Sequence, residues 1–155
     1  MFLETGSSSF GVVHITCEKE INMADALKLN ILTPEKEFYT GEVTEIITDS
    51  TQGRVGILAD HMPLVTTLRP GITEITEKGG KQIKVFTSTG IMEVKDNEVR
   101  ILCDVCELPE EIDFRRAEEA RKRAEERLKS KNHDNLDIRR AELALSRALA
   151  RLKLQ

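Results

Sequence analysis

Tryptophan is absent from this sequence of 155 residues, and aromatic residues make up only 4% of it. Three cysteines, Cys17, Cys103 and Cys106, are too few and odd in number for the disulfide framework of a small secreted domain. No apolar run reaches about 18 residues, which excludes a membrane-spanning helix. The first residues have neither a basic region nor a continuous apolar stretch, so we expect no secretory signal.

Basic residues are not in excess, because 23 Lys and Arg stand against 27 Asp and Glu, for a net charge of -4. Affinity for nucleic acid depends mainly on excess positive charge, so this balance argues against a nucleic-acid partner. The charge is unevenly distributed along the chain. Residues 1–22 carry a net charge of -2, residues 23–108 carry -5 and residues 109–155 carry +3. An acidic body therefore precedes a basic C-terminal region.

Glycine and proline are missing from the end of the chain, since the last glycine is Gly90 and the last proline is Pro109. Before this boundary, short β-rich runs begin roughly 8 to 12 residues apart, which is typical of a β-sandwich or barrel. Gly79-Gly80 and Asp96-Asn97 stand where tight hairpin turns can close. We therefore predict an antiparallel sandwich of roughly 8 to 10 strands over residues 23–108. The expected strands are 27–32, 42–49, 55–58, 64–68, 72–76, 83–89, 91–94 and 99–105.

Two apolar stripes with spacings of three and four residues predict two amphipathic helices within residues 109–155. The polar run 130–135 separates them, so we expect an antiparallel helical hairpin. Asp113 is a candidate N-cap of the first helix, and Asp134 or Asp137 of the second. Because the stripes are narrow and rich in alanine, the hairpin should open more easily than the sandwich unfolds. The first stripe is Ala117, Ala120, Ala124 and Leu128, and the second is Ile138, Ala141, Leu145, Ala148 and Leu152.

Cys103 and Cys106 have the spacing of a redox motif or half of a zinc site, at the end of a predicted strand. Residues three apart on a strand point to opposite faces and lie about 10 Å apart. A disulfide tolerates a Cα separation of at most roughly 7 Å. We therefore predict that Cys103 is a small buried apolar residue and that the pair has no redox role.

The remaining candidates for chemistry are sparse. The three histidines, His14, His61 and His133, are dispersed, so we predict no metal site. No nucleophile elbow, phosphate-binding glycine loop or set of nucleophile, base and acid is evident, so we predict no catalytic residues and no free-standing enzyme.

The arginines of the predicted hairpin are more informative. Arg116 and Arg123 share a face of the first helix, and Arg147 and Arg151 share a face of the second. If the hairpin turns near residue 132, Arg116 falls between Arg147 and Arg151, so three guanidinium groups converge near its open end. Such charges repel one another unless an anion joins them, and arginine is suited to holding phosphate. The alternative is a solvated basic face that pairs with Glu118, Glu119, Glu125 and Glu126.

Three separated segments resemble the epsilon subunit of bacterial F-type ATP synthases, which is called delta in mitochondria. Residues 53–71, GRVGILADHMPLVTTLRPG, resemble that family's signature, although Ala59 stands where the family commonly has proline. Residues 29–43 resemble its first hairpin, and residues 140–152, RAELALSRALARL, resemble its last helix. The resemblance covers about residues 25–155. It implies a flattened sandwich of about ten strands followed by a two-helix hairpin.

The resemblance also implies a function and partners. Members of this family are non-catalytic parts of the proton-translocating rotor, where the sandwich binds the gamma subunit and the c-ring. His61, Met62 and Pro63 would then lie against gamma, although His61 could equally be a structural loop residue. The implied location is peripheral, on the cytoplasmic side of a bacterial cell membrane. The hairpin would either lie folded on the sandwich or extend along gamma into the alpha/beta catalytic head, where it inhibits ATP hydrolysis.

A second motif suggests a ligand. In some bacterial members the folded hairpin binds ATP through an Ile/Leu-Asp-x-x-Arg-Ala motif, and residues 112–117, IDFRRA, match every fixed position. The resemblance implies no required cofactor, with ATP as a regulatory ligand. Asp113 could instead act only as a helix cap. The implied nucleotide-binding residues are Glu107, Ile112, Asp113, Arg116, Ala117, Arg123, Arg147 and Arg151.

Residues 1–22 fit neither pattern and have no recognisable counterpart in the family, so we expect an extension with little order. The chain would then divide into this extension, a sandwich domain at 23–108 and a hairpin domain at 109–155. The alternative to a rotor subunit is a stand-alone β-sandwich binding adaptor with a helical arm.

Overall fold

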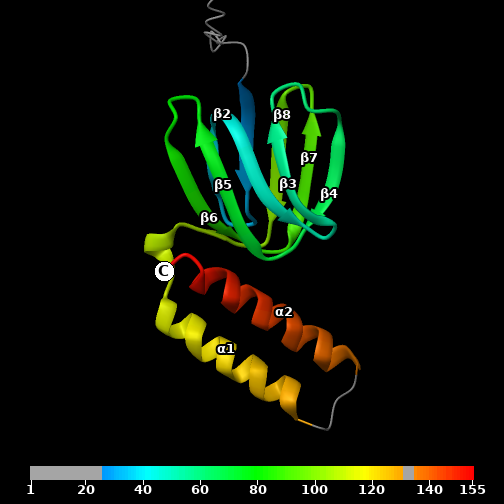
Figure 1. Cartoon of the computed structure of the whole chain (residues 1–155), viewed down its shortest axis with the longest axis vertical. Helices are drawn as coiled ribbons and strands as arrows, with labels where there is room; N and C mark the ends of the chain where they lie inside the picture. Colours follow the sequence, from blue (N-terminus) through cyan, green and yellow to red (C-terminus); the bar gives the residue numbers. More distant parts are fainter. Residues whose placement is uncertain (1–25, 131–134) are drawn as a thin grey trace, which may run out of the picture.

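A computed structural model describes residues 26–130 and 135–155. It consists of a β-sandwich and, packed against one end of it, two helices lying side by side (Figure 1). The predicted N-terminal extension and most of the predicted interhelical loop lie outside the described residues. The order of elements is strands first and helices last, as the change in sequence period predicts.

Nine strands form the sandwich within the described residues, where the family resemblance implies about ten. One layer contains β1, β8, β7 and β4, and the other contains β3, β2, β5, β6 and β9. The bounds are β1 Leu27–Leu32, β2 Glu37–Ser50, β3 Gly53–Leu58, β4 Leu64–Leu68, β5 Gly71–Glu77, β6 Gln82–Thr87, β7 Gly90–Lys95, β8 Glu98–Cys103 and β9 Cys106–Glu107.

The long strand β2 connects the two layers. Its first half pairs with β1 in the hairpin that the family resemblance implies, and its second half pairs with β3 and β5. The prediction of an antiparallel sandwich holds for every described strand pair except one, because β1 and β8 run parallel. This pair joins strands that are far apart in the sequence, where local turn signals carry no information about direction.

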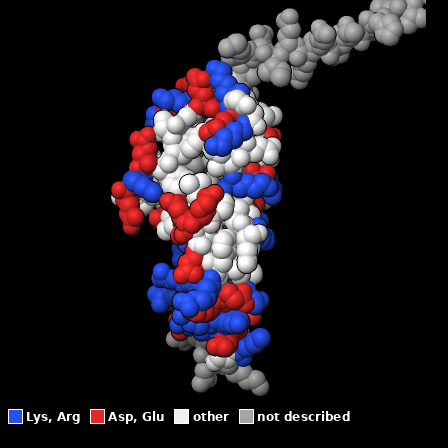
Figure 2. Space-filling model, turned by 90° about the vertical axis from the view of Figure 1, so that its left-hand side faces the viewer, with Lys and Arg blue, Asp and Glu red and all other residues white. Residues whose placement is uncertain are grey.

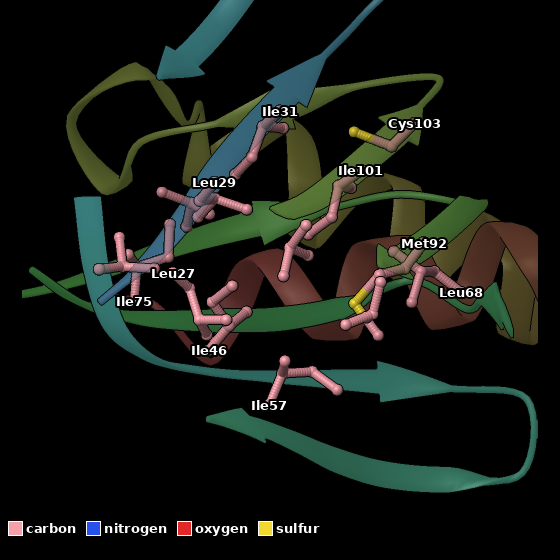
Figure 3. Packing of buried hydrophobic residues seen from close by; sticks show 14 of the residues in the cluster. Leu27, Leu29, Ile31, Ile46, Ile57, Leu68, Ile75, Met92, Ile101 and Cys103 are labelled. Atoms are coloured by element: carbon pink, nitrogen blue, oxygen red, sulfur yellow. The ribbon is translucent and has the colours of Figure 1, made fainter. Parts of the chain in front are cut away.

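The core lies between the layers and follows the alternation expected of half-buried strands (Figure 3). In β1, for example, Leu27, Leu29 and Ile31 are fully buried, whereas Lys28 is exposed. The turn at Asp96-Asn97 joins β7 to β8 with positive φ angles of 51° and 58°, as its residue types predict.

Two helices follow the sandwich, after a short 3-10 turn at Pro109–Glu111. Helix α1 spans Phe114–Lys129, and Asp113 caps it by accepting a hydrogen bond of 2.9 Å from the backbone N–H of Arg116. Helix α2 spans Asn135–Leu152, so Asp137 lies inside its first turn and is not its cap. The candidate cap Asp134 lies outside the described residues. The buried residues that face the partner helix are alanines from the predicted stripes: Ala117, Ala124, Ala141 and Ala148.

A small apolar cluster attaches the hairpin to the sandwich. Phe86 of β6 is fully buried, but it projects from the outer face of the sheet. It packs with Ile112 and Ala150, and Phe114 and Leu154 pack around them. The hairpin therefore depends on a few apolar contacts with the sheet in addition to the contacts between its own helices.

Candidate functional site

A cavity of about 470 Å³ lies where the hairpin meets the sandwich. Four arginines line it, Arg116 and Arg123 from α1 and Arg147 and Arg151 from α2. Its acidic lining residues are Glu107, Glu111 and Asp113, and its remaining lining residues are Val105, Ala117, Ala120, Ala144 and Ala148. Lys and Arg side chains gather over the hairpin end of the molecule, with acidic side chains among and above them (Figure 2).

The two arginines of α2 contact the sandwich. Arg151 donates a hydrogen bond of 2.6 Å from Nε to Glu107 Oε2, and its guanidinium carbon lies 4.2 Å from the centre of the Phe86 ring. The chain thus places a charge-assisted hydrogen bond and a cation–π contact on one side chain. Both contacts join α2 to the sheet, so they exist only while the hairpin is docked.

Arg147 makes a second polar attachment one turn before Arg151. Its Nε donates to Ser88 Oγ at 3.2 Å, and one terminal nitrogen donates to Thr89 Oγ1 at 3.3 Å. Asp104 Oδ2 lies 3.8 Å from the same terminal nitrogen, which makes a long ion pair. The guanidinium is therefore held mainly by neutral hydroxyls and is only partly compensated by a carboxylate.

The two arginines of α1 are exposed and make no ion pair within residues 26–130 and 135–155. The acids of α1 instead pair with another residue, since Arg121 contacts Glu118 at 2.7 Å and Glu125 at 3.1 Å. The hydrogen bond from Arg121 lowers the pKa of Glu118. The solvated-face alternative therefore describes Arg121 and its neighbours, whereas Arg116 and Arg123 are left facing the cavity.

Seven of the eight residues implied by the nucleotide motif line this cavity. Ile112 does not, because its side chain packs in the apolar cluster with Phe86 and Ala150. Sequence reasoning also missed Phe86, Ser88 and Thr89, which contact the arginines of α2. No spacing in the sequence could have identified them, since they lie about sixty residues away from their partners.

The prediction for the two cysteines is wrong in its geometry. Strand β8 ends at Cys103 and a separate strand begins at Cys106, so the expected continuous strand is interrupted. Both residues are free, and both are buried in the main core. A hydrogen bond with Cys106 lowers the pKa of Cys103, whereas the hydrogen bond with Cys103 together with burial raises the pKa of Cys106.

The loop that contains His61, Met62 and Pro63 joins β3 to β4 and contributes no residue to the lining of the cavity. His61 Nδ1 contacts the Met62 carbonyl oxygen at 2.7 Å, and Asp60 is fixed by hydrogen bonds to Asn97. Met62 is 74% exposed and Val65, at the start of β4, is 70% exposed. Ile91 and Leu102 on β7 and β8 are half exposed on the same outer face of the sheet.

Other kinds of site are absent from the described part of the chain. Residues 26–130 and 135–155 contain no group of three or more potential metal ligands. Among those residues, no helix is long and apolar enough to cross a membrane.

Comparison with known families decides the identity of the fold. Residues 26–109 match the ATP synthase delta/epsilon chain β-sandwich domain, and residues 110–154 match the delta/epsilon chain long α-helix domain. The chain belongs to the ATP synthase delta/epsilon family. An ATP synthase epsilon chain of Clostridium kluyveri is 64% identical over 110 residues, which cover 71% of this chain and 83% of the relative. One of Clostridium acetobutylicum is 55% identical over 111 residues, covering 72% and 84%.

Solved structures agree with this assignment. A chain of the Euglena gracilis mitochondrial ATP synthase, in an assembly with OSCP, F1 and c-ring, matches with a TM-score of 0.73 and 25% identity, covering 96% of this chain and 88% of that chain. A chain of the Tetrahymena thermophila central stalk and c-ring shares the fold, with a TM-score of 0.55 and 17% identity, covering 82% and 94%. The relatives are non-catalytic subunits of a rotary complex, so this chain is an epsilon-type central-stalk subunit and not an enzyme by itself. The assignment favours the rotor subunit over the stand-alone adaptor.

Proposed function

We propose that the hairpin is a regulatory element that binds ATP while it is docked on the sandwich and restrains ATP hydrolysis when it is released. The observation that carries this proposal is the convergence of Arg116, Arg123, Arg147 and Arg151 on one cavity. Two of these arginines have no carboxylate partner in the described residues, so an anion in the cavity would relieve their mutual repulsion.

The size and lining of the cavity suit a nucleotide. Its volume of about 470 Å³ lies within the range of small-molecule sites, which is about 300 to 1,000 Å³. Short apolar side chains line part of the cavity and leave room for a planar base. They belong to Ala117, Ala120, Ala144 and Ala148. Arginine can hold phosphate oxygens in pairs through its planar fork of donors. The cavity therefore combines an apolar surface with a cluster of phosphate-binding groups.

Binding ATP would stabilise the docked hairpin specifically. Arg116 and Arg123 come from α1 and Arg147 and Arg151 from α2, so the site exists only when both helices lie side by side against the sandwich. A ligand that binds only this form stabilises it by about 2.7 kcal/mol at a hundredfold excess over Kd. ATP is thus a regulatory ligand in this proposal, and the chain requires no cofactor.

The partners follow from the family and from the surface. We propose that the gamma subunit docks on the loop that contains His61, Met62 and Pro63 and on the neighbouring sheet face formed by Val65, Ile91 and Leu102, and that the sandwich also contacts the c-ring. Exposed apolar side chains that share one face commonly mark a protein interface. The released hairpin, with its net charge of +3, would meet an acidic surface of the alpha/beta catalytic head. The subunit would then be peripheral to the cytoplasmic side of a bacterial cell membrane and take part in proton-coupled rotation.

Calorimetric titration of the isolated protein with ATP tests the ligand. We expect saturable binding at millimolar ATP or below, and Arg116→Ala should weaken it by about tenfold or more, since one charged hydrogen-bonding group is lost. Arg121→Ala is the matched control, because it removes the same charge from the same helix but outside the cavity. Absence of binding at millimolar ATP, or equal weakening by both variants, would contradict the proposed site.

A further inference from the structure

The loop of residues 59–63 crosses from β3 in one layer of the sandwich to β4 in the other. It lies beside the turn that joins β7 to β8, at the end of the sandwich away from the hairpin (Figure 1). None of these residues belongs to a strand, and Met62 among them is 74% exposed. The sheet by itself therefore does not fix the position of this side chain.

Asn97, in the neighbouring turn, holds the loop through both polar atoms of its amide. Its Oδ1 accepts a hydrogen bond of 2.6 Å from the N–H of Asp60, and its Nδ2 donates one of 3.0 Å to Asp60 Oδ1. The two residues are 37 positions apart in the sequence. The hydrogen bonds of His61, in contrast, go to its sequence neighbours Leu58 and Met62. Asn97 thus ties the loop to the layer that contains β7 and β8.

Asn97 is itself held in place by the sheet. Its carbonyl oxygen accepts a hydrogen bond of 2.9 Å from the N–H of Lys28 in β1, and the paired strands β7 and β8 flank its turn. An amide side chain offers a donor and an acceptor, so it can bond both to the N–H and to the carboxylate of Asp60. Aspartate at this position would offer no donor and would place a second negative charge beside Asp60.

Left-handed backbone conformations gather at this corner. Within residues 26–130 and 135–155, the residues other than glycine with positive φ are Asp60 at 59°, Asp96 at 51° and Asn97 at 58°. The tight turn between β7 and β8 requires two of them. The third lies in the loop, where such a conformation persists only if surrounding contacts maintain it. The two hydrogen bonds with Asn97 are contacts of this kind.

Two different devices therefore fix the exposed apolar surface at this end of the sandwich. Val65 lies opposite Glu93 of β7, so strand pairing fixes its position. Met62 lies in the loop, which depends on the pair formed by Asp60 and Asn97. A partner that docks on both side chains would have to order a free loop on binding, at a cost in conformational entropy. The pair removes that cost in advance.

We propose that Asn97 is a positioning residue for docking of the gamma subunit, and that it acts through Asp60 on the loop that contains Met62. This inference rests on the docking surface proposed above. When only a fraction of the molecules has the competent loop conformation, the apparent Kd rises by the reciprocal of that fraction. Loss of the Asn97 side chain should thus slow association, whereas dissociation should change little because Met62 keeps its contacts with gamma.

Hydrogen exchange of the isolated full chain, measured by NMR, tests the effect on the loop. Asn97→Gly deletes the side chain, and glycine tolerates the positive φ of this position. Asp96→Gly is the matched control, because Asp96 also has a positive φ but its side chain makes no hydrogen bond in residues 26–130 and 135–155. The Asp60 amide should exchange about tenfold faster in Asn97→Gly, as expected when the backbone of one residue is released. It should not change in the control.

Binding kinetics test the effect on docking, with a catalytic core that contains gamma and lacks this subunit. Association of Asn97→Gly should be about tenfold slower, and its dissociation rate should stay within about twofold of that of the unmodified protein. Asn97→Asp should also associate slowly, because it cannot donate to Asp60. Asp96→Gly should bind normally. Met62→Ala removes a docking side chain itself, so it should speed dissociation.

The positioning role and the docking surface fail in different ways. The positioning role is overturned if the Asp60 amide exchanges alike in Asn97→Gly and Asp96→Gly. It is also overturned if Asn97→Gly associates normally while Met62→Ala still weakens binding, or if Asn97→Gly speeds dissociation without slowing association. If neither Met62→Ala nor Val65→Ala changes binding to gamma, the docking surface itself is wrong and the positioning role is overturned with it.

Discussion

The sandwich and the hairpin bury very different side chains. The interior of the sandwich is filled by large branched residues, including Leu29, Ile46 and Ile101, which are fully buried. The interface between the two helices is lined by alanines such as Ala117 and Ala148. Because the free energy of burial scales with apolar area, each large residue contributes several times more than an alanine. The sandwich can therefore be stable by itself, whereas the hairpin depends on what it docks against.

The contacts between the two regions explain how one of them could act as a switch. Docking uses one apolar cluster around Phe86 and the polar contacts of Arg147 and Arg151. The same two arginines line the cavity proposed for ATP. Anything that binds these arginines therefore changes the balance between a docked and a released hairpin without changing the sandwich.

The largest expected effect comes from the sandwich core. Ile46→Ala should lower the free energy of unfolding by about 4 kcal/mol, because it leaves a cavity among packed strands. Chemical denaturation followed by circular dichroism measures this change. Val65→Ala removes apolar atoms from a side chain that is 70% exposed, so it serves as a control with little effect. Similar losses in both variants would show that the assigned core is not the stabilising part.

The next effect separates the two regions. Phe86→Ala should weaken docking of the hairpin by about 3 kcal/mol, because Phe86 is fully buried under the hairpin and also stacks on Arg151. Hydrogen exchange should become faster in α2 while the strands keep their protection. Phe86→Leu retains most of the apolar volume and should keep most of the docking. Loss of protection in both regions together would contradict an independently stable sandwich.

A smaller effect tests the polar attachment. Glu107→Gln should weaken docking by about 1 kcal/mol, since the pair with Arg151 is only partly exposed but still screened by solvent. The α2 amides should again exchange faster, and the difference from the unmodified protein should shrink at high salt. Glu110→Gln removes an exposed carboxylate that has no ion pair in residues 26–130 and 135–155. If the two variants behave alike, the Glu107 contact does not hold the hairpin.

Local patterns predicted much of this fold from the sequence. The strand at residues 27–32 has the predicted bounds, and the turn at Asp96-Asn97 and the cap at Asp113 form as their residue types predict. These features depend on interactions between neighbours in the chain, so the sequence records them directly. The helical stripes also place the arginines correctly, because the hairpin geometry is fixed by a regular period.

Features that depend on distant contacts could not be predicted. The parallel pairing of β1 with β8 joins residues about seventy positions apart. Cys103 is buried as predicted, but the expected continuous strand through Cys106 is wrong, because residues 103–106 bend where they run beside residues 87–90. Ile112 matches a nucleotide motif, yet it packs on Phe86 outside the cavity lining. In each case a contact between residues far apart in the sequence decided the direction of a strand or the position of a side chain.

Hydrogen exchange of the isolated protein with and without ATP tests the central claim most directly, namely that a ligand controls the hairpin independently of the sandwich. At a hundredfold excess of ATP over its Kd, the α2 amides should exchange about a hundredfold more slowly, and the sandwich amides should not change. Unchanged exchange in α2, or equal slowing in both regions, would contradict the account.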